Sequence, residues 1–341
     1  MKKAITLLFA ILALSILTVG LLSLDASAAT TSGTTGDCAW TLDDEGVLII
    51  SGTGKMEDYS TTTFFTDAPW GTDVTEVIIE EGVTSIGEAA FYGCGKLTSV
   101  TIGNSVASIG KWAFYCCESL HSIYISDLKA WCEIDFLNYY GANPLYYAKE
   151  LFLNGEMLAG ALVIPNGTTR IGRYAFYRYP AITSITIPDS VTSIDIYAFY
   201  DCDKLTSVTI GNGVTSIGNY AFENCSSLET ITIGKSLASV GEWAFFGCDN
   251  LKDVWYGGTK ADYEKINLQS YNYNLSDATW HGADGETFSE KEDGPTLLGM
   301  VVFLLVVAPV FFFVILLVLY CVIFLIVRII KGAKTKLNKQ G

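Results

Sequence analysis

The stretch 205–233 reads LTSVTIGNGVTSIGNYAFENCSSLETITI, and it decides the fold of the chain. It opens on Leu-Thr-Ser-Val-Thr-Ile, runs on to Ala-Phe-Glu-Asn-Cys at 221–225, and then begins its first pattern again with Leu-Glu-Thr-Ile-Thr-Ile. The spacing from Val208 to Ile231 is 23 residues. A pattern that returns at a period of about 20 to 50 residues is typical of a solenoid, in which each copy stacks on the next.

Six copies of this pattern occur along the chain, and they start at Val77, Val100, Leu162, Ile185, Val208 and Ile231. Alternating apolar residues in the first segment of each copy predict a short strand. The Val-Thr-Ser-Ile segment that follows favours a second short strand or an extended corner. The block around Ala-Phe is too short for a long helix, and we expect one or two helical turns there.

Every copy carries a phenylalanine at the same position, and these residues are Phe91, Phe114, Phe176, Phe199, Phe222 and Phe245. One turn of chain cannot bury such a side chain alone, but stacked neighbours can, at a gain of roughly 1.5–3 kcal/mol for each. We therefore predict that these six side chains form the repeat core.

The copies occupy 74–253 and are interrupted once, by an insert at 123–161. Asp127 is a good helix N-cap and predicts a short helix over 127–136, and Asn154-Gly155 predicts a hairpin turn. A solenoid needs atypical end units to cover its open core faces. We assign a linker and N-terminal cap to 29–73, a C-terminal cap to 254–281 and an acidic stalk to 282–296.

Both ends of the chain are apolar. Residues 1–28 combine Lys2 and Lys3, an apolar run and a small-residue site, which predict a secretory signal peptide; an uncleaved anchor is the alternative. Residues 297–327 carry no charge and exceed the roughly 20 residues that span a bilayer. A basic tail follows at 328–341, so we expect a single-pass type I protein of the plasma membrane, with its repeats outside the cell.

The part predicted to lie outside the cell is strongly acidic. Residues 29–296 contain 14 Lys and Arg against 35 Asp and Glu, a net charge of −21. This charge argues against nucleic acid and anionic membrane surfaces as partners. Solubility alone is the simpler explanation for it.

The segments Leu97-Thr-Ser-Val-Thr-Ile102 and Leu205-Thr-Ser-Val-Thr-Ile210 match the L-x-x-L-x-L core of leucine-rich repeats. Together with the 23-residue period and Ile-Gly-x-x-Ala-Phe-x-x-Cys, they resemble the BspA-like bacterial surface class. The resemblance implies an α/β leucine-rich-repeat right-handed solenoid, displayed on a cell surface for adhesion or host-factor binding. The usual asparagine ladder is replaced by Ser105, Ser190, Gly213 and Ser236, so its backbone hydrogen bonds need other partners.

Five cysteines share one phase of the repeat, with Tyr179 in their place in one copy; they are Cys94, Cys117, Cys202, Cys225 and Cys248. Such periodic thiols favour small buried core residues, with a disulfide framework as the alternative in a secreted protein. The sequence has no Cys-x-x-Cys and only two histidines, so we expect no metal site. It also lacks hydrolase and phosphate-loop motifs, and we expect neither catalysis nor a cofactor.

Aromatic residues recur on both sides of each core phenylalanine. Not all of them can face inward, so we predict that some form an exposed aromatic ribbon that contacts a protein or glycan. The alternative is that they pack against neighbouring repeats and complete the core. Polar strand positions Thr101, Thr186, Thr209 and Thr232 make up the opposite face. The candidate ligand contacts are Trp112, Tyr174, Tyr197, Tyr220, Trp243, Tyr124, Trp255 and, in the insert, Trp131.

These features predict a membrane-anchored surface module that recognises an extracellular protein or glycan. A structural envelope protein that self-associates through its solenoid surfaces is the alternative. We expect a local binding site where the sequence departs from the repeat, at the variable positions of the aromatic ribbon and in the insert at 123–161.

Overall fold

The computed structural model describes residues 30–61, 65–137 and 140–289. By its contacts the chain divides into two compact units, Met1–Phe288 and Ser289–Gly341, and only the first is described below. The expected signal peptide at 1–28, membrane span at 297–327 and basic tail at 328–341 lie outside the described residues. Within the described ranges, no helix combines the length and the apolar character that a membrane crossing needs.

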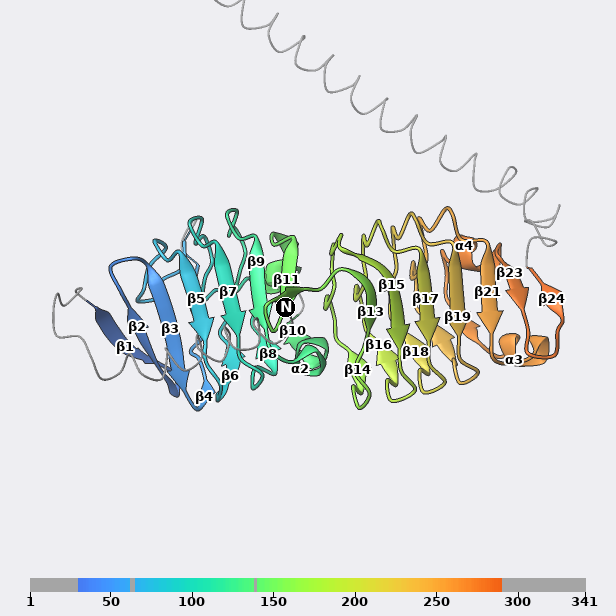
Figure 1. The fold of residues 1–341 in the computed structure, drawn as a ribbon, viewed down its shortest axis with the longest axis horizontal. Coiled ribbons are helices and arrows are strands. Elements are labelled where there is room, and N and C mark those ends of the chain that lie inside the picture. Colours follow the sequence, from blue (N-terminus) through green and yellow to red (C-terminus); the bar gives the residue numbers. More distant parts are fainter. Residues whose placement is uncertain (1–29, 62–64, 138–139, 290–341) are drawn as a thin grey trace, which may run out of the picture. The chain divides into compact units, whose positions relative to one another are not determined.

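The described chain is a solenoid with two main sheets (Figure 1). The first sheet has the order β1-β2-β3-β5-β7-β9-β11-β12, and its strands are β1 (Thr31–Thr35), β2 (Cys38–Leu42), β3 (Val47–Gly52), β5 (Glu76–Ile79), β7 (Ser99–Ile102), β9 (Ser122–Ile125), β11 (Glu150–Leu153) and β12 (Glu156–Met157). The second has the order β13-β15-β17-β19-β21-β23-β24, and its strands are β13 (Gly160–Val163), β15 (Ile182–Ile187), β17 (Ser207–Ile210), β19 (Thr230–Ile233), β21 (Asp253–Tyr256), β23 (Thr279–His281) and β24 (Thr287–Phe288). We call residues 31–157 the first segment and residues 160–288 the second segment.

A second layer of two- to four-residue strands lies across the core from each main sheet. In the first segment its members are β4 (Gly54–Lys55), β6 (Val83–Ile86), β8 (Ser108–Ile109) and β10 (Asp135–Phe136). In the second segment they are β14 (Arg170–Ile171), β16 (Ser193–Ile194), β18 (Ser216–Ile217), β20 (Ser239–Val240) and β22 (Asn267–Leu268). The Val-Thr-Ser-Ile segments therefore form strands, as one of the two sequence interpretations had it.

Strand alternation places the core between the two layers. In β17, Val208 and Ile210 are buried, whereas Ser207 and Thr209 lie on the outer face. Each main strand of a repeat pairs in parallel with the equivalent strand of the next repeat. Equivalent residues lie opposite each other, as Val208 does with Ile231. Equivalent residues consequently form straight rows along the solenoid.

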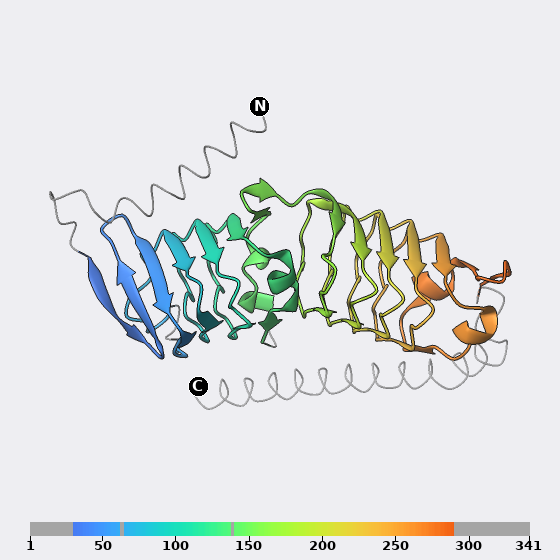
Figure 2. The same ribbon diagram turned by 60° about the horizontal axis from the view of Figure 1, so that its bottom comes forward.

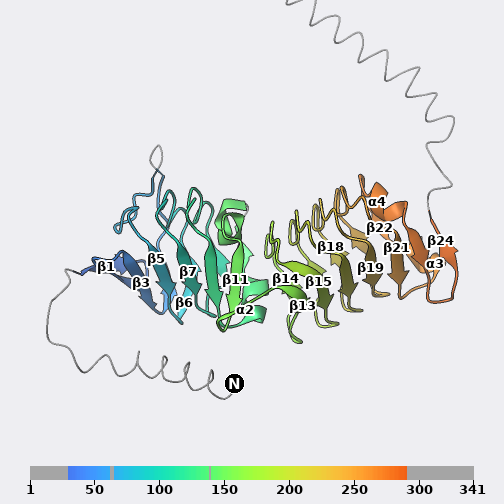
Figure 3. The same ribbon diagram turned by 45° about the horizontal axis from the view of Figure 1, so that its top comes forward.

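The Ala-Phe blocks are stacked turns rather than helical turns, which corrects the sequence expectation. Each contains left-handed residues, such as Tyr197 at φ 60° and Asp201 at φ 55°, and a helix cannot continue through them. Alternate amides bond to the neighbouring repeat: the N–H of Phe199 donates to Ala221 O at 2.8 Å, and that of Asp201 to Glu223 O at 2.8 Å. The turns form a row of loops along the top of Figure 3.

The six core phenylalanines are all fully buried. They form two columns of stacked rings, one in each segment. Phe91 and Phe114 lie 5.2 Å apart between ring centroids, with Trp70 of the N-terminal cap stacked on Phe91 at 5.7 Å. In the second column the successive spacings, from Phe176 to Phe245, are 5.3, 5.0 and 5.2 Å.

The insert is part of the solenoid. Asp127 caps the helix α2 (Leu128–Glu133), which is shorter than the expected 127–136. β10 then joins the second layer, the 3-10 helices η2 (Tyr140–Ala142) and η3 (Pro144–Tyr146) take the place of the Ala-Phe turns, and β11 pairs in parallel with β9. The expected hairpin is formed by β11 and β12 around Asn154-Gly155. The insert is thus one longer turn of the solenoid followed by a hairpin.

The second segment ends in the same way as the first. After β21 come α3 (Lys260–Tyr263), β22, α4 (Tyr273–Ser276), β23 and the antiparallel strand β24. Since β23 and β24 form a hairpin, residues 282–288, which the sequence analysis assigned to the stalk, belong to the folded unit instead. The rest of the expected stalk, from residue 290, lies outside the described residues. The insert is therefore the terminal unit of the first segment, and Figure 2 shows its helix in green between the two runs of strands.

Candidate functional site

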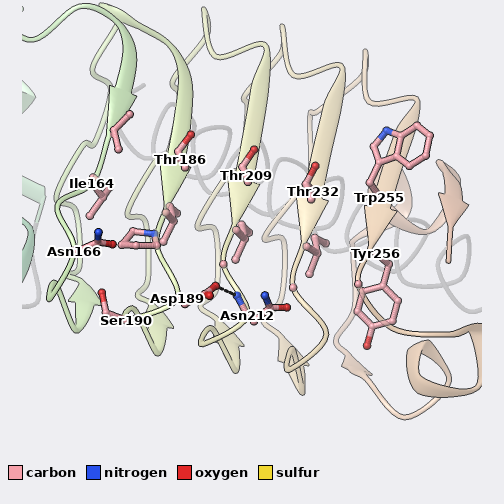
Figure 4. A pocket seen from close by; sticks show the side chains of 18 of the residues that line it. Ile164, Asn166, Thr186, Asp189, Ser190, Thr209, Asn212, Thr232, Trp255 and Tyr256 are labelled. Carbon is pink, nitrogen blue, oxygen red and sulfur yellow. Dashed lines mark hydrogen bonds between the residues drawn. The ribbon is translucent and has the colours of Figure 1, made fainter. Parts of the chain in front are cut away.

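An open groove of about 840 Å³ follows the ends of the main strands in the second segment (Figure 4). One side is the outward row of the sheet, in which each residue lies opposite the next in register: Val163, Thr186, Thr209, Thr232, Trp255 and His281. The three threonines point away from the core because their strand neighbours, such as Ile185 and Ile187, point into it. The row therefore presents a hydroxyl on each of three successive strands.

The floor of the groove consists of the small or ring-closed residues that follow each strand. They are Pro165, Pro188, Gly211, Gly234 and Gly257. A Cβ at Gly211 would come within 2.6 Å of the Asp189 nitrogen, and one at Gly234 within 2.5 Å of Gly211 O. Glycine at these corners thus lets successive turns stack closely, and it leaves Gly211, Gly234 and Gly257 without a side chain on the floor.

The far side of the groove carries carboxylate and amide groups on the corner turns. The Asn212 N–H donates to Asp189 Oδ1 at 2.5 Å, and the Lys235 N–H donates to Asn212 Oδ1 at 3.3 Å. In the neighbouring turn, the Gly167 N–H donates to Ser190 Oγ at 3.0 Å. Side chains of the corner turns, including Ser190 at one position of the missing asparagine ladder, thus accept from backbone N–H groups of the neighbouring turns.

An aromatic platform closes one end of the groove. Trp255 stacks on His281 with 4.1 Å between ring centroids, and His281 Nε2 lies 2.7 Å from Asp253 Oδ1. Trp255 is still 52% exposed. Two neighbouring strands and a carboxylate therefore hold an open indole in one orientation.

The first segment has a smaller groove of the same design. It has a volume of about 490 Å³ and is lined by the outward residues Ile78, Thr101 and Tyr124. Tyr124 is 37% exposed and stacks on Phe152 at 5.0 Å. This pair occupies β9 and β11, the strands equivalent to β21 and β23, so each terminal unit ends its row with two stacked rings.

The predicted aromatic ribbon is present, but most of its surface is covered by its own members. Tyr174, Tyr197 and Tyr220 stack at 5.2 and 4.6 Å, and Trp243 continues the column at 6.5 Å. Tyr174 is buried, and the others are half-buried. Burial raises the pKa of Tyr197 to about 12. This arrangement favours the alternative interpretation, in which the rings lean on neighbouring repeats.

Two further candidate contacts lie away from the grooves. Trp112 is half-buried beneath Lys111, whose Nζ lies 3.7 Å from the ring centroid. The prediction for Trp131 is wrong: α2 turns its indole into the core, where it is 1% exposed and its Nε1–H donates to Ala175 O at 3.0 Å. Trp131 therefore joins the two segments and cannot contact a ligand.

The periodic cysteines are buried free thiols. Cys202, Cys225 and Cys248 each donate to the carbonyl of the phenylalanine one repeat earlier, at 3.1–3.2 Å. Burial raises the pKa of the Cys94 thiol to about 12. In the copy with tyrosine, the Tyr179 hydroxyl accepts from Leu151 N at 3.3 Å and donates to Leu158 O at 2.5 Å, which ties the second segment to the hairpin of the first.

Among the groove-lining residues, the ionisable side chains are Asp189, Tyr256 and His281. Within the described part of the chain, no cluster of three His, Cys, Asp or Glu side chains could hold a metal ion. The one histidine among the groove-lining residues, His281, is stacked on Trp255 and hydrogen-bonded to Asp253. The groove presents hydroxyls, amides, one carboxylate and apolar side chains beside the exposed ring of Trp255, and these groups can bind a ligand.

The sequence matches the BspA type leucine-rich repeat region in six copies, over residues 67–140 and 149–276. The chain belongs to this family. The BspA-type match includes the insert apart from 141–148, in keeping with its place in the solenoid.

Solved structures with similarity to this BspA-type chain include bacterial leucine-rich repeat proteins. One from Eubacterium ventriosum is 23% identical, with 74% of this chain and 78% of that chain covered and a TM-score of 0.38. One from Bacteroides ovatus is 20% identical, with coverages of 76% and 72% and a TM-score of 0.40. A leucine-rich cell surface protein from Faecalibacterium prausnitzii is 20% identical, with coverages of 72% and 99% and a TM-score of 0.30. No curated protein matches the chain.

Proposed function

We propose that this protein is a non-catalytic recognition module of the cell surface, which binds an extracellular protein or glycan along the groove of its second segment. The C-terminal helix expected at 297–327 anchors it in the plasma membrane as a single-pass type I protein. The BspA type repeats support a recognition role, and the similar protein from Faecalibacterium prausnitzii is described as a cell surface protein.

The observation that carries the proposal is the groove itself. It extends across six strands, it is open, and it brings an exposed tryptophan together with a row of hydroxyls. The side chains on its floor and walls leave room for an elongated ligand, whereas the aromatic ribbon is largely occupied with its own stacking. Tryptophan is also among the residues that dominate binding energies at interfaces.

A matched pair of threonines on one strand tests the site. Thr186 lies in the groove, and Thr183 lies on the same strand outside it; both are exposed. Thr186→Lys places a long side chain in the groove, so the full-length protein should lose at least about tenfold in affinity for any ligand found by screening extracellular matrix proteins and glycans. Thr183→Lys should bind as the unmodified protein does.

Equal binding by the two variants would contradict the placement of the site in this groove. Hydrolysis of any bound ligand by the purified protein would contradict the non-catalytic assignment. Stable oligomers in sedimentation experiments without ligand, together with no ligand in the screen, would instead support a self-associating envelope protein.

A further inference from the structure

We propose that the ligand of the second-segment groove is a neutral, β-linked glycan chain, with one sugar ring packed against Trp255. The inference rests on the proposed function and narrows its ligand to one chemical class. Four features of the groove lead to it: its linear shape, its lack of cations, the pairing of its strands and the fixed orientation of its aromatic platform.

The shape of the groove suits a chain rather than a compact ligand. Its lining includes residues of β13, β15, β17, β19, β21 and β23. Strands in a sheet lie about 4.8 Å apart, so the groove extends over about 24 Å. Its threonines at 186, 209 and 232 repeat at this strand spacing, which is close to the advance of one sugar in an extended β-linked glycan. Each sugar can thus meet an equivalent hydroxyl.

The lining combines apolar side chains with hydroxyls and amides, and it is almost uncharged. Among its residues Asp189 is the only carboxylate, and there is no lysine or arginine. An anionic glycan would find no cation to pair with in the groove, and it would be repelled by the acidic surface around it. A neutral glycan fits, because threonine hydroxyls and asparagine amides can both donate to and accept from sugar hydroxyls.

An extended peptide fits this lining less well. Peptides that bind along a sheet pair their backbone with an unpaired strand edge. The strands β15, β17, β19 and β21 are each paired on both sides. A peptide in the groove would therefore leave most of its backbone N–H and C=O groups without backbone partners, and burying such groups unpaired is unfavourable. Sugar hydroxyls need only the side chains that the groove presents.

Trp255 provides the surface that a sugar ring requires. A pyranose ring has an apolar face of C–H groups and a rim of hydroxyls, so it packs on an open aromatic ring beside hydrogen-bonding side chains. Trp255 is 52% exposed, His281 stacks on it, and Asp253 holds His281. Because the indole is already oriented, little side-chain entropy is lost on binding. The pair Tyr124 and Phe152 repeats this platform beside the smaller groove.

Isothermal titration of the full-length protein with cellohexaose, and with β-1,4-linked mannohexaose as a second extended neutral chain, tests the proposal. At least one should bind and change the tryptophan fluorescence. Trp255→Ala should weaken binding at least about tenfold, and Trp255→Tyr should restore most of it. Tyr273→Ala is the matched control, because Tyr273 is a 60% exposed aromatic outside the groove, and it should bind normally. A hyaluronan hexasaccharide should not bind.

The outcomes separate this inference from the proposed function. If a protein ligand binds in a way that depends on Trp255 and Thr186, and neither neutral hexasaccharide binds, the assignment of a glycan ligand is overturned. The proposed function as a recognition module then still holds. Preferential binding of the hyaluronan hexasaccharide overturns the argument from charge. Glycan binding that Trp255→Ala leaves unchanged, while its melting temperature matches the unmodified protein, overturns the placement of the sugar at this ring.

Discussion

At the scale of the residue, one buried phenylalanine in each repeat is expected to stabilise the fold. Phe222 is stacked between Phe199 and Phe245 and has no exposed surface. Phe222→Ala removes both ring contacts and leaves a cavity, so the free energy of unfolding should fall by about 3–5 kcal/mol. Denaturant unfolding monitored by circular dichroism measures this loss.

Phe246 provides the matched control, because it directly follows the core residue Phe245 in the chain but is 37% exposed. Phe246→Ala should cost less than about 1.5 kcal/mol, since it loses the contact with Trp243 at 4.6 Å but opens no closed cavity. If the two variants unfold at the same denaturant concentration, the stacked column is not what stabilises the repeats.

The burial of these phenylalanines could be predicted because repetition reveals it: one position keeps the same large apolar residue in six copies. Trp131 has no equivalent residue in the other repeats. It occurs once, in a region that departs from the repeat, and a solitary tryptophan gives no sign of which face of a short helix it occupies. Only the packing of α2 against β14 and the bond to Ala175 show that it faces the core.

At the scale of the element, a side chain replaces a backbone carbonyl as hydrogen-bond acceptor in the last unit of the second segment. Elsewhere the N–H of a core phenylalanine bonds to a carbonyl of the following turn. Phe245 instead donates to Asn272 Oδ1 at 3.0 Å, while Asn272 Nδ2 donates to Gly241 O and Gln269 O at 2.8 Å each. Asn272 is 3% exposed.

Asn272→Ala should therefore destabilise the second segment, because it leaves buried backbone groups without partners at a cost of about 1–3 kcal/mol for each that water cannot reach. Hydrogen exchange of the Phe245 amide should accelerate. Asn250→Ala is the control: Asn250 also donates to a backbone carbonyl, Ser226 O at 2.7 Å, but it is exposed and water can replace it. Unchanged protection at Phe245 in Asn272→Ala would show that the unit is not held by this amide.

The terminal units also show where prediction from sequence stopped. The repeats were recognisable from their 23-residue spacing, but Ile123 to Leu151 spans 28 residues and Val254 to Trp280 spans 26. The two units share few residues, so their common architecture could not be detected as repetition. The groove was missed for a different reason: its floor is formed by glycines and prolines, whose small or ring-closed side chains give no signal of a binding surface in the sequence.

At the scale of the whole molecule, the two segments are joined through the terminal unit of the first. Asn143 is fully buried, and its Nδ2 donates to Tyr174 O in the second segment at 2.5 Å, while its Oδ1 accepts from Leu145 N at 2.8 Å. The Gly172 N–H donates to Cys132 O at 2.6 Å. In a solenoid the stability of each unit depends on its interfaces with its neighbours, so these few contacts determine whether the segments unfold together.

Asn143→Ala and Asn272→Ala form a pair that tests this coupling. Asn143 bonds across the junction, whereas Asn272 bonds only within the second segment. We expect Asn143→Ala to split the calorimetric unfolding of the described solenoid into two transitions, because it removes a buried contact between the segments and leaves each column of phenylalanines intact. Asn272→Ala should lower the stability of the second segment and increase hydrogen exchange there first. A single unfolding transition in Asn143→Ala, with exchange rising equally in both segments, would mean that the junction is held by the packing of Trp131 and its neighbours rather than by this amide.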